Sequence, residues 1–326
     1  MPRPRIAGVV DISGTEGATV RTHPATNIVI SPRIIVPPRD TSGYWRSAWE
    51  RLRHDRAALI GGFIVIALAT VALLAPVIAP YDPNQRFRDG LGDLGQPLPA
   101  GGKFLLGTDG IGRDLLSRLI WGGQVSLLIG VAANSLAVAL GLILGATAGY
   151  AQGVLGQIIM RLVDVLMAFP PLLLAIALAA LLRPSVGVVI TVIALTYWIY
   201  LARIVYGQTL SLREKEFIEA ARAVGAGHVS IIVRHLMPHL ASVAIVYATL
   251  GIASTVLTEA SLSYLGIGVR PPTASWGSLI REAQQYYRAA PGLILFPGLV
   301  LTLAVMGFNL LGDGLRDALD PYQKGR

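Results

Sequence analysis

The chain has 326 residues, of which 53% are hydrophobic and only 14% are charged. Soluble proteins carry about 25% charged residues, and the apolar residues here form long uninterrupted blocks, so we exclude an ordinary soluble fold. The formal net charge of +8 could indicate nucleic-acid binding, but the basic residues are spread through the loops and form no stripe, which excludes that partner. The lack of cysteine excludes disulfides and thiol chemistry.

The N-terminal region contains scattered Pro, Gly, Thr and Arg and lacks the apolar centre of a signal peptide. We interpret residues 1–43 as a disordered cytoplasmic tail. The next segment, 44–56, places Trp45, Trp49 and Leu52 on one helical face and its basic side chains elsewhere. Aromatic and basic residues directly before an apolar block are typical of an interfacial helix, so we expect a juxtamembrane helix there.

Six blocks free of charged residues follow, and each is long enough to cross a bilayer. A hydrocarbon layer of about 30 Å needs about 20 residues of helix, and backbone polar groups in lipid must be satisfied within their own segment. The chain is therefore expected to be an all-α membrane protein of about six transmembrane helices. The predicted spans are 57–79, 124–147, 164–182, 186–206, 240–262 and 291–311.

A long Gly- and Pro-rich segment separates the first two predicted spans. Pro76, Pro80 and Pro83 are expected to end the first helix. Residues 114–123 carry apolar and basic side chains at amphipathic spacing, which predicts a helix lying flat on the outer surface. We therefore expect residues 57–123 to contain the first span and an extracytoplasmic loop.

Two motifs within the spans predict helix geometry. Gly141, Gly145 and Gly149 lie four residues apart, and small residues at this spacing allow helix backbones to approach closely in lipid. The sequence Phe-Pro-Pro at 169–171 is expected to kink or interrupt the third span. Such a break serves either a pathway that opens or a static bundle.

Charged residues at the span edges are candidates for either structure or function. Asp164 lies one helical turn from Arg161, which predicts an ion pair between them. Glu259, near the outer end of the fifth span, is a candidate for an outer gate, since ionisable groups in membranes are often functional. Further candidates for lining a pathway are Asn134, Tyr197, Tyr200 and Asn309.

A charged segment, residues 213–239, separates the fourth and fifth predicted spans. Apolar residues from Phe217 to Val224 recur at the spacing of an amphipathic helix, and early acidic residues complement its dipole. Gly225 follows as a natural helix end. Such a short helix either docks into a groove of a cytosolic partner or packs against its own bundle.

The same segment resembles the EAA loop of ABC importer permeases. Glu219, Ala220 and Ala221 match the motif, Gly225 follows, and Pro238 ends the sequence His-Leu-Met-Pro, where the family usually has Ile-x-Leu-Pro. The resemblance implies that these residues form a coupling helix that seats on an ATP-binding subunit.

Three further segments are similar to the C-type subunit of dipeptide, oligopeptide and nickel importers. They are LGTDGIGRDLLSRLIWGGQVSL (106–128), LTEASLSYLGIGVRPPTASWGSLI (257–280) and NLLGDGLRDALDP (309–321). The resemblance extends over about residues 45–322. It implies a type I ABC importer permease fold.

This resemblance also implies a domain plan and partners. We expect a core permease domain at 124–313 and a cytoplasmic tail at 314–326. The implied partners are a homologous permease subunit, two cytosolic ATP-binding subunits and an extracytoplasmic solute-binding protein. The implied cargo is a di- or oligopeptide, with nickel chelates, glutathione and oligosaccharides left open.

The sequence contains no nucleotide-binding loop of its own, because the pair Gly102-Lys103 is followed by Phe104 and Pro97 stands where the first Gly belongs. We expect no enzyme activity and no cofactor in this chain. No metal site is expected either, although two histidines flank Pro238. The alternative is a self-sufficient secondary transporter or channel, but paired inverted repeats with buried ionisable groups are not evident.

Most lysines and arginines outside the spans lie on the same side as the N-terminus. The positive-inside rule therefore predicts a multi-pass protein of the prokaryotic inner membrane with both termini in the cytoplasm.

Overall fold

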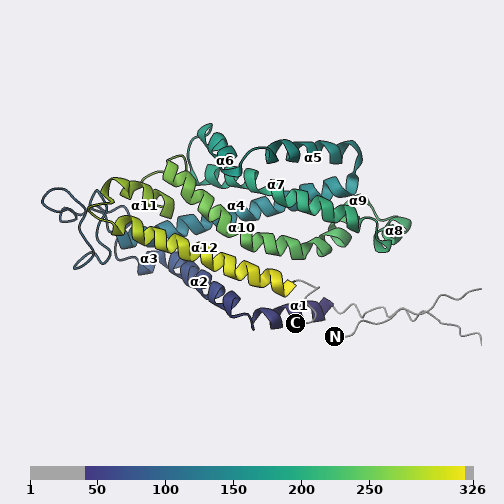
Figure 1. The fold of residues 1–326 in the computed structure, drawn as a ribbon, viewed down its shortest axis with the longest axis horizontal. Helices are drawn as coiled ribbons and strands as arrows, with labels where there is room; N and C mark the ends of the chain where they lie inside the picture. Colours follow the sequence, from purple (N-terminus) through teal and green to yellow (C-terminus); the bar gives the residue numbers. More distant parts are fainter. Residues whose placement is uncertain (1–40, 320–326) are drawn as a thin grey trace, which may run out of the picture. The chain divides into compact units, whose positions relative to one another are not determined.

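The computed structural model describes residues 41–319, and within this part of the chain every named element is a helix. The expectation of an all-α fold is confirmed. Residues 1–40 of the tail predicted at 1–43, and the last residues, 320–326, lie outside the described residues. The remaining part of that predicted tail, 41–43, belongs to the first helix. The elements in chain order (Figure 1) are α1 (Thr41–Leu52), α2 (Arg56–Leu73), α3 (Ala75–Ile78), α4 (Leu115–Ala151), α5 (Gly153–Met167), α6 (Pro171–Ala180), α7 (Val186–Leu212), α8 (Glu216–Ala223), α9 (His228–Ser230), η1 (Ile231–Leu236), α10 (Met237–Leu265), α11 (Trp276–Ala283), η2 (Gln284–Tyr286) and α12 (Gly292–Leu319).

Five of the described helices are long and apolar enough to cross a membrane. They are α2, α4, α7, the continuous helix His228–Leu265 and α12. The pair α5 and α6 makes a sixth span if the two count as one, and they meet at an angle of 94°. The expectation of about six spans is confirmed in this sense, and the predicted break at Phe-Pro-Pro is confirmed because α6 begins at Pro171.

The third predicted span, 164–182, begins too late, because α5 begins at Gly153. Asp164 was placed at the edge of the span, but it lies within α5, as does Arg161. The predicted ion pair between them is also wrong, since Asp164 accepts a 2.6 Å hydrogen bond from Arg203 of α7. A charge inside a helix is tolerated where a neighbouring helix supplies its partner.

The flat surface helix predicted at 114–123 is wrong, because these residues begin α4. Asp114 caps this helix by accepting hydrogen bonds from the backbone N–H and the hydroxyl of Ser117, at 2.7 and 2.6 Å. Leu115 and Arg118, in the first turn, are fully or almost fully buried. The loop after α3 therefore ends at Asp114, and the predicted boundary at 123 falls inside a spanning helix.

The three spaced glycines of α4 allow it to pack directly on α7. A Cβ atom at Gly145 would lie 2.5 Å from the carbonyl oxygen of Ala202, and one at Gly141 would lie 2.8 Å from that of Trp198. Gly149 meets α7 equally closely, at Thr209. The predicted close approach is confirmed, and α4 packs more extensively against α7 than any other pair of described helices.

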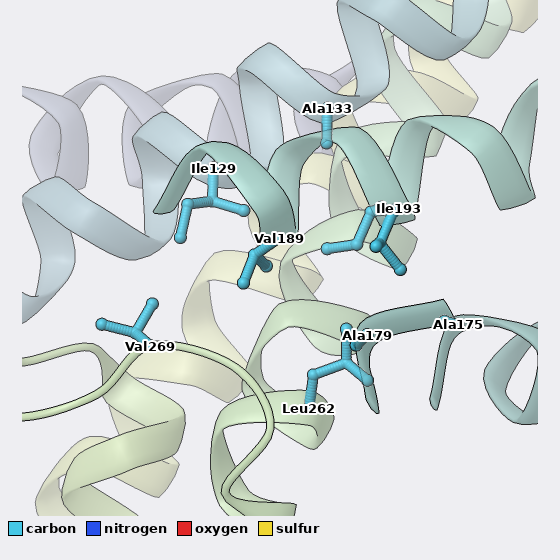
Figure 2. Packing of buried hydrophobic residues seen from close by; sticks show 9 residues of the cluster. Ile129, Ala133, Ala175, Ala179, Val189, Ile193, Leu262 and Val269 are labelled. Atoms are coloured by element: carbon cyan, nitrogen blue, oxygen red, sulfur yellow. The ribbon is translucent and has the colours of Figure 1, made fainter. Parts of the chain in front are cut away.

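The interior between α4, α6, α7 and α10 is filled by aliphatic side chains that meet in one cluster (Figure 2). The labelled members of this cluster are Ile129, Ala133, Ala175, Ala179, Val189, Ile193, Leu262 and Val269. Burial of the valine, isoleucine and leucine side chains stabilises each by about 1.5–3 kcal/mol relative to exposure in water. In lipid the same contacts act through close packing, which holds α6 in place after the sharp turn.

The C-terminal boundary also differs from the prediction, because α12 continues to Leu319, beyond the tail predicted to start at 314. Ala318 and Leu319 are buried and pack with Ala48 of α1. A helix is thus present where the juxtamembrane helix was expected, although α1 ends at Leu52 and Asp55 then caps α2. The interfacial location of α1 stays a prediction.

Candidate functional site

The predicted coupling segment forms α8, which lies at one end of the bundle, opposite α11 (Figure 1). Ile218 is its anchor, since this side chain is fully buried among residues of α4, α7, η1 and α10. Phe217 and Ala221 are partly buried against the same cluster. The face that α8 turns to its own chain therefore consists of Phe217, Ile218 and Ala221.

This arrangement corrects the predicted apolar stripe. Ala220 is exposed, and Val224 is 90% exposed, although both were expected on one face with Phe217 and Ala221. Half of the stripe thus packs on the bundle, and the other half remains uncovered in this chain. We give the name α8 surface to five of the exposed residues on α8 and at its end: Glu219, Ala220, Ala223, Val224 and Gly225.

Gly225 ends α8 as predicted. Its φ is +83°, in the left-handed region that favours glycine. The N–H of Gly225 donates to the carbonyl of Arg222 at 2.9 Å, and the N–H of Ala226 reaches back to Ala221 at 3.0 Å. These bonds satisfy carbonyls that the helix end leaves free. Ala220, Ala223 and Gly225 project little from the backbone, and the turn at Gly225 has a fixed conformation.

Pro238 lies in the first turn of α10 and is exposed. It follows η1, a π-helical stretch at Ile231–Leu236 in which the N–H of Met237 donates to Ile232. A proline ring clashes with the carbonyl four residues before it, and the wider π turn removes this conflict. The chain is therefore helical without interruption from α9 into α10, which the sequence did not indicate.

The two histidines beside Pro238 connect α8 with α10. The ring of His239 lies 4.9 Å from that of Phe217, centroid to centroid. His235 turns its Nδ1 toward the carbonyl of Ser230, at 3.4 Å. Residues 41–319 contain no group of three or more His, Cys, Asp or Glu side chains that could hold a metal ion.

Three of the four candidate pathway residues lie together. Asn134, Tyr197 and Tyr200 line one cavity of about 230 Å³ between α4, α7 and α10. Asn309 lies exposed on α12 and does not line this cavity. The remaining lining residues, missed from the sequence, are Ala137, Val138, Leu201, Tyr247, Leu250, Gly251 and Ser254.

The α10 side of this cavity had a signal in the sequence. Tyr247, Gly251 and Ser254 are spaced by four and three residues, which places them on one helical face. Asn134 donates to the carbonyl of Ala248 at 2.6 Å and so joins α4 to α10 beside the cavity. The hydroxyl of Tyr197 lies 2.6 Å from that of Thr258. The lining thus offers hydroxyl and amide groups and no charged side chain.

Glu259 lies away from this cavity and is fully buried. The hydroxyl of Ser126 donates to its carboxyl at 2.9 Å, and that of Ser263 donates at 2.6 Å. Ser126 also accepts the backbone N–H of Trp276 at 3.1 Å. Glu259 therefore joins α4, α10 and the start of α11. A role as an outer gate stays a prediction.

A second buried polar cluster at the α11 end was not found from the sequence. Arg113 donates to Asp109 at 2.6 Å and to Glu282 at 2.7 Å. Arg118, fully buried, lies 3.0 Å from Glu282 and 3.4 Å from Asp109. We call Asp109, Arg113, Arg118 and Glu282 the α11-end ion cluster. This cluster holds the loop before α4 against α11. The sequence offered one sign of it, because Asp109 and Arg113 are four residues apart on the loop, a spacing that allows an ion pair.

Comparisons with known proteins agree with this geometry. Residues 104–324 match the family described as binding-protein-dependent transport system inner membrane component, and residues 43–97 match the N-terminal TM domain of oligopeptide transport permease C. Similar proteins include the glutathione transport system permease protein GsiD of Shigella boydii serotype 4 (strain Sb227) and of Escherichia coli O157:H7. Each is 42% identical over 297 residues, which cover 91% of this chain and 97% of the relative.

A solved structure has a similar fold. It is a chain of the MetNI methionine ABC transporter in an inward facing conformation, with a TM-score of 0.51 and 18% sequence identity. The match covers 63% of this chain and 98% of that chain. At this identity the likeness concerns the fold alone, and it confirms the predicted type of permease fold.

Proposed function

The chain belongs to the binding-protein-dependent inner-membrane permeases and has an N-terminal module of the oligopeptide permease C type. From this membership we propose that it forms half of the translocation path of an ATP-driven peptide importer. It is a multi-pass ABC importer permease subunit, and ATP hydrolysis resides in separate subunits. Membership of this family excludes the alternative that the chain is a self-sufficient secondary transporter or channel. It also implies ATP-binding subunits and a binding protein as partners.

The proposed complex contains this chain, one homologous permease subunit, two ATP-binding subunits and an extracytoplasmic solute-binding protein. The cavity between α4, α7 and α10 supports a second permease subunit, because it is open on this chain alone. A homologous helix set facing it would enclose one path between the two subunits.

The α8 surface is the observation on which the proposed coupling depends. Ile218 fixes α8 to four other elements, while Val224, directly after the end of α8, is almost fully exposed. A helix held firmly on one face and uncovered on the other suits docking into a groove of a partner. Glu219, Ala220 and Gly225 are therefore proposed to contact an ATP-binding subunit, with Pro238 marking the start of the helix that receives the motion.

The motion has a direct route into the pathway. Phe217 of α8 packs against His239 in α10, and α10 carries Tyr247 and Gly251 into the cavity wall eight and twelve residues later. Closure of the ATP-binding subunits would displace α8 and rotate α10 as a rigid body. We propose that this rotation switches the cavity between the two sides of the membrane.

The orientation follows from the same proposal. The α8 end of the bundle lies in the cytoplasm, and the α11 end, with the loop after α3, faces the binding protein. Both termini are then cytoplasmic, which agrees with the concentration of basic residues before α2 and between α7 and α10.

We propose peptides as the transported class. Similar proteins are named as permeases of a glutathione transport system, and glutathione is itself a short peptide. Hydroxyl and amide groups such as those of Asn134, Tyr197 and Ser254 can bond to peptide groups of any sequence. A lining without charge is consistent with cargo selection by the binding protein.

Gly225 provides a test of the proposed coupling. Valine at a left-handed position costs about 1–2 kcal/mol of strain, so Gly225→Val is expected to lower uptake of labelled glutathione or dialanine about tenfold. Gly225→Asn should retain more uptake, since asparagine tolerates this conformation. Gly227, whose φ is −68° and which also has open space around it, gives the control Gly227→Val. Full uptake by Gly225→Val in a normally inserted protein would count against the proposal.

A further inference from the structure

A small pocket lies beside the α8 surface, where α4 ends. Its volume is about 240 Å³. Its lining consists of Tyr150, Ala151, Gln152, Arg213, Arg222 and His228. We call this the basic pocket. It lies apart from the cavity proposed as the translocation path, and the coupling mechanism makes no use of it.

The polar groups of the basic pocket are held in place by one another. Arg213 donates to the backbone carbonyl of Tyr150 at 3.2 Å, and the guanidinium of Arg222 lies 5.3 Å from the centre of the Tyr150 ring. The hydroxyl of Tyr150 lies 3.2 Å from Nδ1 of His228. Tyr150 is only 7% exposed. It thus positions all three basic side chains around one opening.

No carboxylate balances these basic groups within the described part of the chain. The ion pairs among residues 41–319 involve neither Arg213, Arg222 nor His228. The Nε atom of Arg213 is buried without a hydrogen-bond partner among the described residues. Two guanidinium groups with free donors in a concave site favour an anion with several oxygen atoms, such as a phosphate group.

An apolar surface begins directly beside the basic pocket. Helix α5 starts at Gly153, one residue after Gln152, and one of its faces is exposed along its whole length. These exposed side chains fall on one helical face, as the spacing of their positions requires. They are Val154, Leu155, Ile158, Leu162 and Val165.

We propose that the basic pocket binds the phosphate of an anionic phospholipid, with the acyl chains lying along the exposed face of α5. Basic pockets between helices at the cytoplasmic side of a membrane bind such headgroups. The phosphate would bond to Arg213 and Arg222, and the amide of Gln152 could bond to the glycerol moiety. A lipid bound there contacts both α4 and the segment that carries α8, so it would hold the coupling segment against the bundle.

The test uses the full chain, purified in a mild detergent and titrated with dioctanoyl phosphatidylglycerol. Binding is followed by native mass spectrometry and by the shift in melting temperature. We expect saturable binding that weakens about tenfold in the double variant Arg213→Gln/Arg222→Gln, because each arginine supplies charge-assisted bonds. Arg222→Gln alone should weaken it less. This single variant also covers the case in which loss of Arg213 disturbs folding.

Arg234→Gln is the matched control, because Arg234 is exposed on the same segment and lies outside the pocket lining. It removes the same charge and should leave lipid binding unchanged. The proposal is overturned if the double variant binds phosphatidylglycerol as the unaltered chain does, or if dioctanoyl phosphatidylcholine binds equally well. Inorganic phosphate binding as tightly as the lipid would overturn the lipid assignment in favour of a free anion.

Discussion

The two ends of the bundle treat their arginines differently. At the α11 end, Arg113 and Arg118 are buried, and each lies within ion-pair distance of a carboxylate. At the α8 end, Arg213 and Arg222 have no such partner among the described residues. A buried arginine without a carboxylate would be costly, so the α11 end completes its own charge balance. This difference in ion pairing agrees with our proposal that other molecules complete the α8 end.

The largest expected effect comes from breaking the α11-end ion cluster. Asp109→Asn leaves two buried arginines with a single carboxylate, that of Glu282. One positive charge of the cluster then lacks its counter-charge, and breaking a buried ion pair in this way costs about 3–5 kcal/mol. We expect a large fall in the melting temperature of the purified chain. Asp89→Asn is the control, because Asp89 pairs with Lys103 at an exposed site. Equal melting temperatures for the two variants would contradict the claim that the α11 end depends on buried pairs.

The second effect sharpens the contrast within the α8 end. Ile218→Ala removes a fully buried side chain, which costs about 2–5 kcal/mol in well-packed sites, and we expect α8 to detach locally. Hydrogen exchange should increase across residues 216–223 with little change in α12. Val224→Ala, at an exposed position, should change stability by less than about 0.5 kcal/mol. If both variants exchange alike, Ile218 does not anchor α8.

The smallest effect concerns pH at the exposed pair. The hydrogen bond from Lys103 lowers the pKa of Asp89 below its usual value. A carboxyl with a lowered pKa stabilises the folded state above its unfolded pKa of about 3.9, and this contribution is lost as the pH falls through the folded value. We expect a small difference in melting temperature between the unaltered chain and Asp89→Asn at pH 7 that disappears below about pH 4. A difference that grows on acidification would contradict this assignment.

Local sequence patterns predicted the features that depend on neighbours along the chain. The apolar blocks indicated the spans, the spaced glycines around Gly145 indicated a close contact with another helix, and Gly225 indicated the end of α8. Each of these follows from backbone geometry or side-chain size within a few turns of helix.

Features that depend on distant partners were missed. Arg118 was placed on a helix lying flat on the outer surface, because its partner, Glu282, lies 164 residues further along the chain. Asp164 was paired with its near neighbour, although Arg203 reaches it from α7. The periodic pattern of α8 also omitted Ile218 from its apolar face. Ile218 is buried because the side of α8 that the bundle covers differs from the side that the pattern predicted.

The most direct test of the account asks what the α8 surface touches in the cell. The chain contains no cysteine, so Val224→Cys and Leu94→Cys each introduce a single thiol at a position that is at least 90% exposed, one at each end of the bundle. In membranes of the native host, a thiol-directed crosslinker should join Val224→Cys to an ATP-binding subunit and should not join Leu94→Cys to one. An impermeant maleimide added outside the inner membrane should label only Leu94→Cys. Labelling of Val224→Cys from outside, with no crosslink to an ATP-binding subunit, would contradict the proposed orientation and the coupling role of α8.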